Sequence, residues 1–230
     1  MKVTVLRQPA YLLHARAYRE SSAIVELLTL EHGRVAGVAR GVRGGRRPQP
    51  IEVFCLMEIG WRGAGSLVTV TGREVVRRWR LSGRALFSGM YVNELLVRSL
   101  RPAEAVPNLF GAYEKTLGLL ESEDDLEPPL RVFEKRLLFE LGYAPTFDIE
   151  SVSGREVSDD GAYAFAEGEG FRRAGAAGES TFPGWVLREI ANDRYESREV
   201  RRAAKAILRV ALQPHLGPRP LASRELFRRR

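Results

Sequence analysis

The spacing of apolar residues changes near residue 80, and this change constrains the fold more than any other feature of the sequence. Before it, short apolar runs alternate with glycine-containing turns, a pattern typical of β-strands. After it, leucine and aromatic residues recur at the three- and four-residue spacing of amphipathic helices. We therefore expect an α+β protein with a β-rich N-terminal part and a helical remainder.

Five runs before residue 80 are expected to be strands. They are Ala10–Tyr18, Ser22–Leu30, Val35–Arg40, Glu52–Trp61 and Leu67–Val76. Gly33 marks the turn between the second and third runs, since glycine adopts positive φ readily. The run GVRGGRRPQP at 41–50 is rich in glycine and proline, so it is expected to be a loop. Five strands in about eighty residues predict a small barrel or sandwich.

Helical periodicity dominates the remaining residues. The expected helices are Leu81–Leu100, Asn108–Leu120, Leu130–Leu141, Pro183–Asn192, Arg198–Gln213 and a short one starting at Ser223. Gly142 stands where a C-cap glycine is expected, and Ser197 where an N-cap is expected. Residues 148–182 contain six glycines and only short apolar pairs, which predicts a loop or small β-insert. The predicted domains are therefore 1–80 and 81–230, with the insert inside the second.

The positive charge is concentrated in the same first eighty residues. They hold fourteen basic and six acidic residues, a net charge of +8, whereas residues 81–230 carry −1. A small β-domain with such a field favours a phosphate backbone as its partner, because binding releases counterions. The alternative is an ordinary basic surface without a specific partner.

Arginines near loops and strand ends are the candidate nucleic-acid-binding residues. They are Arg34, Arg40, Arg43, Arg46, Arg47 and Arg62, with Arg73, Arg77 and Arg78 as weaker candidates. Tyr18 and Trp61 lie near strand ends, where they could either stack on bases or pack at the rim of the barrel.

No catalytic or cofactor motif stands out. The glycine-rich loop lacks the spacing of a Walker-type phosphate cradle, and the three histidines show no ligand spacing. Cys55 is the only cysteine, so a disulfide within the chain and a multi-cysteine zinc site are excluded. No signal peptide and no apolar run of about 18 residues is present. We expect a cytoplasmic protein that is not an enzyme, binds no cofactor and does not enter membranes.

Several strings, in order along nearly the whole chain, resemble the RecO family of bacterial recombination mediators. They are YLLHARAYRESS from Tyr11, HGRV from His32, VARG from Val38, LFSGMYVNELL from Leu86, FE to LGY between Phe133 and Tyr143, HLG from His215 and LASRELF from Leu221. The resemblance implies an N-terminal OB-fold, a five-stranded β-barrel, followed by a helical region.

The resemblance also implies a function in DNA repair and recombination. Members of this family bind single- and double-stranded DNA, associate with the nucleoid and anneal complementary strands. They act with RecR, meet the C-terminal tail of single-stranded DNA-binding protein, and thereby help to load RecA. Carried over to this chain, Arg131 is the best candidate contact for that tail, and Lys135 and Arg136 are weaker ones. The alternative is that all three are solvated helix charges.

The sequence departs from the family at one segment and leaves other functions open. Many members carry a four-cysteine zinc module where residues 148–182 lie here, and this segment has no cysteine, so a metal-free insert is expected. An RNA-binding OB-fold protein, an enzyme assembled from scattered residues, and an adaptor for an acidic protein remain alternatives.

Overall fold

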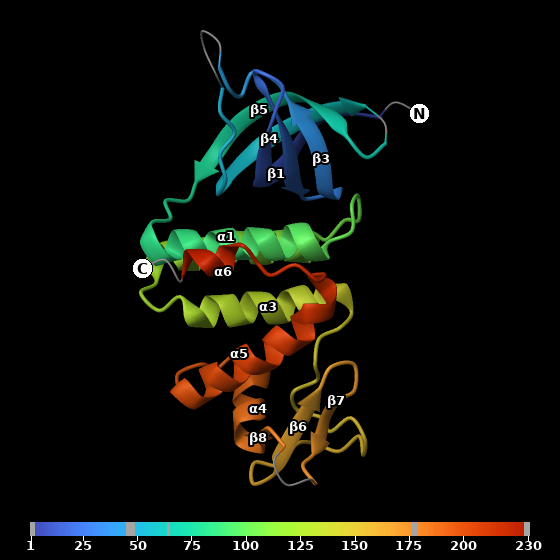
Figure 1. The fold of residues 1–230 in the computed structure, drawn as a ribbon, viewed down its shortest axis with the longest axis vertical. Helices are drawn as coiled ribbons and strands as arrows, with labels where there is room; N and C mark the ends of the chain where they lie inside the picture. The colour runs from blue at the N-terminus through green and yellow to red at the C-terminus, as the bar shows by residue number, and fades with distance from the viewer. Residues whose placement is uncertain (1–2, 45–48, 64, 176–178, 228–230) are drawn as a thin grey trace. The chain divides into compact units, whose positions relative to one another are not determined.

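The computed structural model describes residues 3–44, 49–63, 65–175 and 179–227 (Figure 1). The chain forms two compact units, which we describe separately. Unit 1 consists of Met1–Asp124 together with Pro218–Arg230, and unit 2 consists of Asp125–Gly217. The domain boundary expected at residue 80 stays a prediction. No helix among the described residues is both long enough and apolar enough to cross a bilayer.

Unit 1 contains a closed barrel of five strands. They are β1 (Val3–Tyr18), β2 (Ser22–Thr29), β3 (Gly33–Ala39), β4 (Cys55–Gly63) and β5 (Val68–Arg78). Neighbours follow the order β1-β2-β3-β5-β4, and β4 also pairs with β1. All pairs are antiparallel except β3 with β5. The predicted α+β class with an N-terminal OB-like barrel is thereby confirmed.

Strand β1 is buried on both of its faces near residues 10–13. Leu12 belongs to the barrel interior together with residues such as Ile59 and Trp61. Tyr11 points the other way, and its ring centroid lies 5.2 Å from that of Phe110 and 4.9 Å from that of Tyr113. The barrel therefore has a covered side as well as sides that face solvent.

Three helices complete unit 1. They are α1 (Gly83–Ser99), α2 (Pro107–Ser122) and the short α6 (Ser223–Leu226). The β2–β3 turn fits closely against the α1–α2 loop, because a Cβ on Gly33 would lie only 1.7 Å from the Glu104 carbonyl oxygen. Gly33 also has a φ of +60°, so the turn requires glycine both for its conformation and for the close approach.

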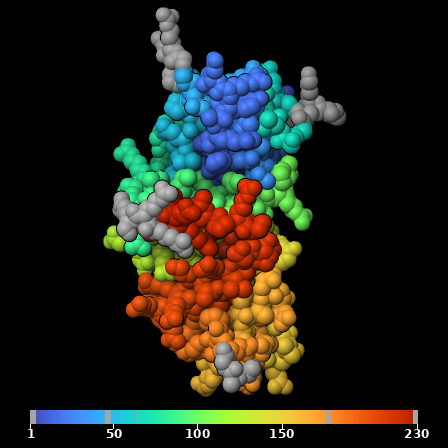
Figure 2. Space-filling view, in the orientation of Figure 1, coloured from blue at the N-terminus to red at the C-terminus, as the bar shows by residue number. Residues whose placement is uncertain are grey.

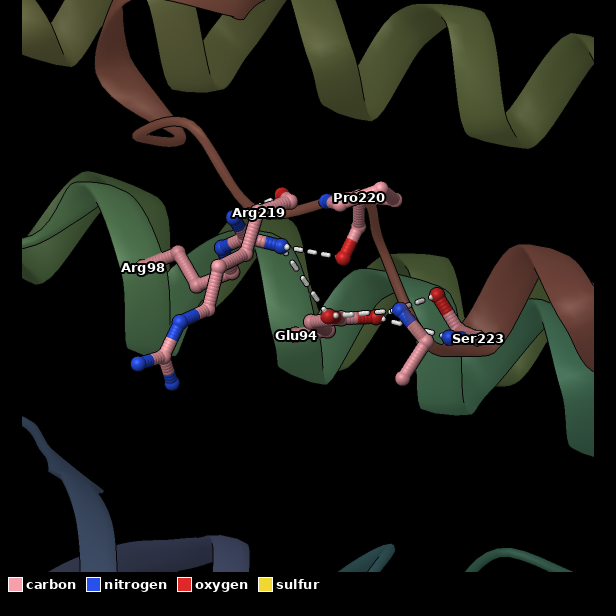
Figure 3. Close-up of polar contacts among 6 residues, drawn as sticks. Glu94, Arg98, Arg219, Pro220 and Ser223 are labelled. Carbon is pink, nitrogen blue, oxygen red and sulfur yellow. Dashed lines mark hydrogen bonds and ion pairs between the residues drawn. The ribbon is translucent and has the colours of Figure 1, made fainter.

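Residues 218–227, which we call the C-terminal strap, fasten to α1 (Figure 3). The Glu94 carboxylate accepts hydrogen bonds from the backbone nitrogens of Ala222 at 2.9 Å and Ser223 at 2.8 Å. It also accepts one from the Ser223 hydroxyl at 2.6 Å. Arg98 donates to the Pro220 carbonyl oxygen at 3.1 Å and to that of Arg219. Two side chains of α1 thus hold the strap by its backbone.

Unit 2 combines three helices with a small sheet. The helices are α3 (Glu127–Leu141), α4 (Gly184–Ala191) and α5 (Arg198–Leu212), followed by the 3-10 turn Gln213–His215. The sheet has the order β7-β6-β8, with β6 at Ala162–Ala166, β7 at Gly170–Arg173 and β8 at Thr181–Pro183. The segment predicted as a loop or small β-insert therefore contains strands.

Both expected helix caps in unit 2 are confirmed. Gly142 ends α3 with a φ of 81°, and its N–H donates to the carbonyl oxygens of Leu138 and Phe139. The Ser197 hydroxyl accepts from the backbone nitrogens of Glu199 and Val200 at the start of α5. These contacts satisfy backbone groups that helix ends leave without partners.

Candidate nucleic-acid interface

A row of outward-facing side chains crosses the barrel at one level. The strand register places Arg16 of β1 beside Ile24 of β2, and Ile24 beside Val38 of β3. Val38 lies beside Thr69 of β5, which lies beside Arg62 of β4. Both terminal arginines are exposed, and the three side chains between them are half-buried. We call these five residues the transverse row. The three side chains between the two arginines are uncharged, so a nucleic-acid strand can lie across β2, β3 and β5 without meeting a carboxylate of this row.

The β1–β2 turn and the base of the basic loop lie together at one end of the barrel. The Ser21 carbonyl oxygen in the turn accepts from the backbone nitrogens of Val42 and Arg43 at 3.0 and 3.2 Å. Arg73 of β5 donates to the Arg40 carbonyl oxygen at 3.2 Å. Arg19, Arg40 and Arg43 are all exposed at this end. Arg46 and Arg47 lie outside the described residues.

Arg34 differs from the other candidates because its side chain is already engaged. Its exposed fraction is 17%, and its guanidinium lies 2.9 Å from the Glu26 carboxylate. It also donates to the carbonyl oxygen of Leu100 at the end of α1, at 3.0 Å. Within unit 1, Arg34 therefore joins the barrel to α1.

Ion pairing separates the barrel arginines into two groups. Arg7 pairs with Glu58 and Glu74, and Arg78 pairs with Glu52. Arg40, Arg43 and Arg62 make no ion pair within the described residues. Their charges are not neutralised by a neighbouring carboxylate, so they contribute most to an attraction for phosphates. The segments that carry them belong to the blue and cyan part of the surface in Figure 2.

The aromatic residues of the barrel have different environments. Trp61 is 4% exposed and belongs to the barrel core, so its ring packs rather than stacks on a base. Trp79 is buried, and the Arg77 guanidinium carbon lies 3.6 Å from its ring centroid. Tyr18 is half-buried beside the β1–β2 turn, with Arg19 5.1 Å from its ring centroid. Of these three rings, Tyr18 is the one placed where a base could stack.

Sequence reasoning did not select Arg16, Arg19 or Thr69. Arg16 and Arg19 lie at the end of the predicted strand Ala10–Tyr18 and directly after it, and that position was an available signal. Thr69 enters the transverse row only through the parallel pairing of β3 with β5, which joins segments distant in the sequence. No local pattern indicates such a pairing.

The three candidate partner residues all engage neighbours inside unit 2. Arg131 is 6% exposed and lies 2.8 Å from the Glu134 carboxylate. Arg136 lies 2.6 Å from the Glu140 carboxylate. Lys135 donates to the carbonyl oxygens of Ile190 at 2.5 Å and Ala191 at 3.1 Å, which places a cation at the C-terminal end of α4. Their contribution to partner binding stays a prediction.

Metal-ligating side chains do not gather in the part of the chain that the structure describes. No three histidine, cysteine, aspartate or glutamate residues there lie close enough to hold an ion. Burial raises the pKa of the Cys55 thiol, with opposing contributions from Arg78.

Two family models together match almost the whole chain. The model described as "Recombination protein O N terminal" covers residues 1–79, and "Recombination protein O C terminal" covers residues 80–225.

Curated relatives agree with these matches. A "DNA repair protein RecO" from Pseudomonas putida is 45% identical, over 97% of this chain and 97% of its own length. Proteins of the same name from Cellvibrio japonicus and Methylococcus capsulatus are 41% and 38% identical, over 96% and 97% of this chain and 95% and 93% of their own lengths. The resemblance noted in the sequence is thus confirmed, and the chain belongs to the recombination protein O (RecO) family.

Proposed function

We propose that this protein is a non-catalytic, DNA-binding recombination mediator that acts in DNA repair. Single-stranded DNA would cross the barrel along the transverse row, between the exposed Arg16 and Arg62. The observation that carries this proposal is that Arg40, Arg43 and Arg62 lie on that part of the barrel and pair with no carboxylate among the described residues. Cations of this kind release counterions when they meet phosphates, whatever the base sequence.

Annealing of complementary strands follows from the same electrostatics. Two DNA strands repel each other through their phosphates, and a basic surface screens that repulsion while the bases search for register. Such a surface also binds double-stranded DNA, because the contacts are to the backbone. The activity requires neither a catalytic residue nor a cofactor.

The partners are proposed from the family. Together with RecR, the protein would act on DNA coated by single-stranded DNA-binding protein, contact the C-terminal tail of that protein, and so help to load RecA. Arg131, Lys135 and Arg136 are the proposed tail contacts. Arg136 is the first to test, since its side chain is 37% exposed whereas that of Arg131 is 7% exposed.

Salt dependence of DNA binding tests the placement on the barrel. We expect the triple variant R40A/R43A/R62A to bind an unstructured single strand more weakly, with a log–log salt slope shallower by about 2, since each lost phosphate contact removes about 0.7. R7A is the matched control, because Arg7 is also exposed but is paired with Glu58 and Glu74. Fluorescence anisotropy titrations at several salt concentrations give both slopes.

Four outcomes would contradict this assignment. An unchanged slope in the triple variant, or an equal change in R7A, would place the DNA elsewhere. Tighter binding of an RNA of equal length would favour the RNA-binding alternative. Partner capture that survives nuclease treatment while DNA binding is undetectable would favour the adaptor.

Strand annealing tests the mediator role separately from DNA binding. We expect annealing of strands coated with single-stranded DNA-binding protein to fall when that protein lacks its C-terminal tail. R136A should produce part of the same loss and leave the annealing of naked strands unchanged. Equal annealing rates with and without the tail would contradict the mediator role without contradicting DNA binding.

A further inference from the structure

Unit 2 contains a cavity of about 330 Å³ that the proposed function does not use. It lies where the end of α3, the β6–β7 turn and the end of α5 meet. Its walls include the rings of Tyr143, Phe165 and His215 and the turn residues Glu167 and Glu169. Its volume lies within the range of pockets that hold ligand groups, roughly 300–1,000 Å³.

The cavity lining carries negative charge from Glu167 and Glu169, whereas the chain as a whole is positively charged. Residues 143–170 hold seven carboxylates and one arginine, although the chain as a whole carries +7. No lysine or arginine is among the described residues that line the cavity. Of the seven carboxylates, only Asp159 makes an ion pair within the described residues, with Arg188. Glu167 and Glu169 therefore line the cavity without an ion-pairing lysine or arginine among the residues that the structure describes.

The aromatic walls add a second attraction for cations. The Tyr143 and His215 rings pack against each other with their centroids 4.3 Å apart and their planes tilted by 41°, and Tyr143 is 60% exposed. Burial lowers the pKa of His215, although Glu167 acts in the opposite direction. The imidazole is therefore mainly neutral at neutral pH and adds little positive charge. Ring faces attract cations through their quadrupoles, most strongly for a guanidinium.

We propose that this cavity binds an arginine or lysine side chain from a basic segment of a protein partner. The cation would lie between the carboxylates of Glu167 and Glu169 and the faces of the aromatic rings, where charge-assisted hydrogen bonds and cation–π contacts act together. A nucleic acid does not fit here, because its phosphates would be repelled. The chain would then have a basic barrel for DNA and an acidic cavity for protein.

An NMR titration of the full-length protein tests this site. The probe is a blocked Gly-Ser-Arg-Ser-Gly peptide, and the matched control carries citrulline, which has the same shape without the charge. We expect the arginine peptide to shift the amide signals of residues 142–146 and 165–170 and to bind at least about tenfold more tightly than the citrulline peptide. The double variant E167Q/E169Q should lose that difference, whereas E123Q/E196Q, with the same change in charge, should keep it.

Several results would overturn the proposal. Equal binding of the two peptides, shifts confined to other residues, or an equal loss in both double variants would each remove the cavity as a cation site. Self-association that E167Q/E169Q abolishes would make the occupant a second copy of this chain. DNA affinity of E167Q/E169Q should match that of the unchanged protein, so a failure here is distinguishable from a failure of the DNA-binding assignment.

Discussion

Arginines on one small barrel perform different tasks according to their immediate neighbours. Arg62 is exposed and pairs with no carboxylate in the described part of the chain, whereas Arg34 is held by Glu26 and by the Leu100 carbonyl oxygen. The first arrangement leaves a charge available to a phosphate. The second uses the charge inside the protein, so a substitution there should affect stability before it affects binding.

We expect R34A to lower the free energy of unfolding by about 1–3 kcal/mol. The substitution leaves Glu26 and the Leu100 carbonyl oxygen without their partner, and hydrogen bonds to charged groups contribute in this range. Urea denaturation followed by circular dichroism measures the change. R7A should cost less than about 1 kcal/mol, because exposed ion pairs contribute little. A loss of DNA affinity without a loss of stability in R34A would show instead that Arg34 contacts the strand.

At the scale of elements, the C-terminal strap depends on one carboxylate. Burial tends to raise the pKa of Glu94, but hydrogen bonds from Ser223, Ala222 and Arg98 outweigh it and leave the pKa below its ordinary value. Because the pKa of Glu94 is lowered in the folded state, its ionised carboxylate stabilises the folded protein at pH values above the ordinary pKa of 4.5. This stabilisation is lost as the pH falls through the lower folded-state value.

The variant E94Q should therefore be less stable than the unchanged protein at pH 7, by about 1–3 kcal/mol, and the difference should shrink below pH 4.5. Urea denaturation at pH 7 and near pH 4 gives both differences. Hydrogen exchange of the amides of residues 222 and 223 provides a local measurement, because these amides donate to Glu94. A constant difference at both pH values, or the same effect in E123Q, would contradict this account.

The sequence predicted most helices and strands, but not the strand bounds and pairings that depend on contacts between distant segments. Strand β1 begins at Val3 rather than Ala10, because residues 3–9 also pair with β4, with a register shift between Val5 and Gln8. Strand β4 begins at Cys55 rather than Glu52, because Phe54 has a φ of 59° and interrupts the extended chain. The short β8 has no periodicity of its own and depends on pairing with β6.

The sequence predicted which arginines belong to the candidate site, but not which of them are free to contact a ligand and which are engaged within the protein. Exposure of Arg40, Arg43 and Arg62 agrees with their selection from the sequence. The contacts of Arg34 could not be predicted, because its partners lie on other elements of the folded chain. Glu26 reaches Arg34 across neighbouring strands, and the Leu100 carbonyl oxygen comes from a distant helix end. The Arg131 contact is different, because Glu134 lies three residues away on the same helix, a spacing that the sequence shows.

For the whole molecule, the two units differ in charge. Unit 1 holds 23 basic and 13 acidic residues, whereas unit 2 holds 13 basic and 16 acidic residues. The net charges are therefore +10 and −3. Since phosphate contacts dominate affinity for DNA, unit 1 should carry most of the binding.

Cross-linking to DNA tests this division on the intact protein. We expect ultraviolet cross-links to a photoreactive single strand to map by mass spectrometry to residues 16–78. Residues 143–170 should yield few, because their carboxylates repel phosphates. The yield from residues 16–78 should fall in R40A/R43A/R62A. Comparable yields from the two regions would contradict the proposed division of tasks between units.

The strap has a consequence for how the chain is made. Residues 125–217 form unit 2, yet unit 1 needs residues 218–227 to cover part of α1. On the ribosome, the barrel, α1 and α2 emerge early, and α1 keeps a bare surface until all of unit 2 has been translated. Unit 1 can thus acquire its final fold only after unit 2 has been synthesised. Synthesis of unit 1 begins first, yet its folding is completed last.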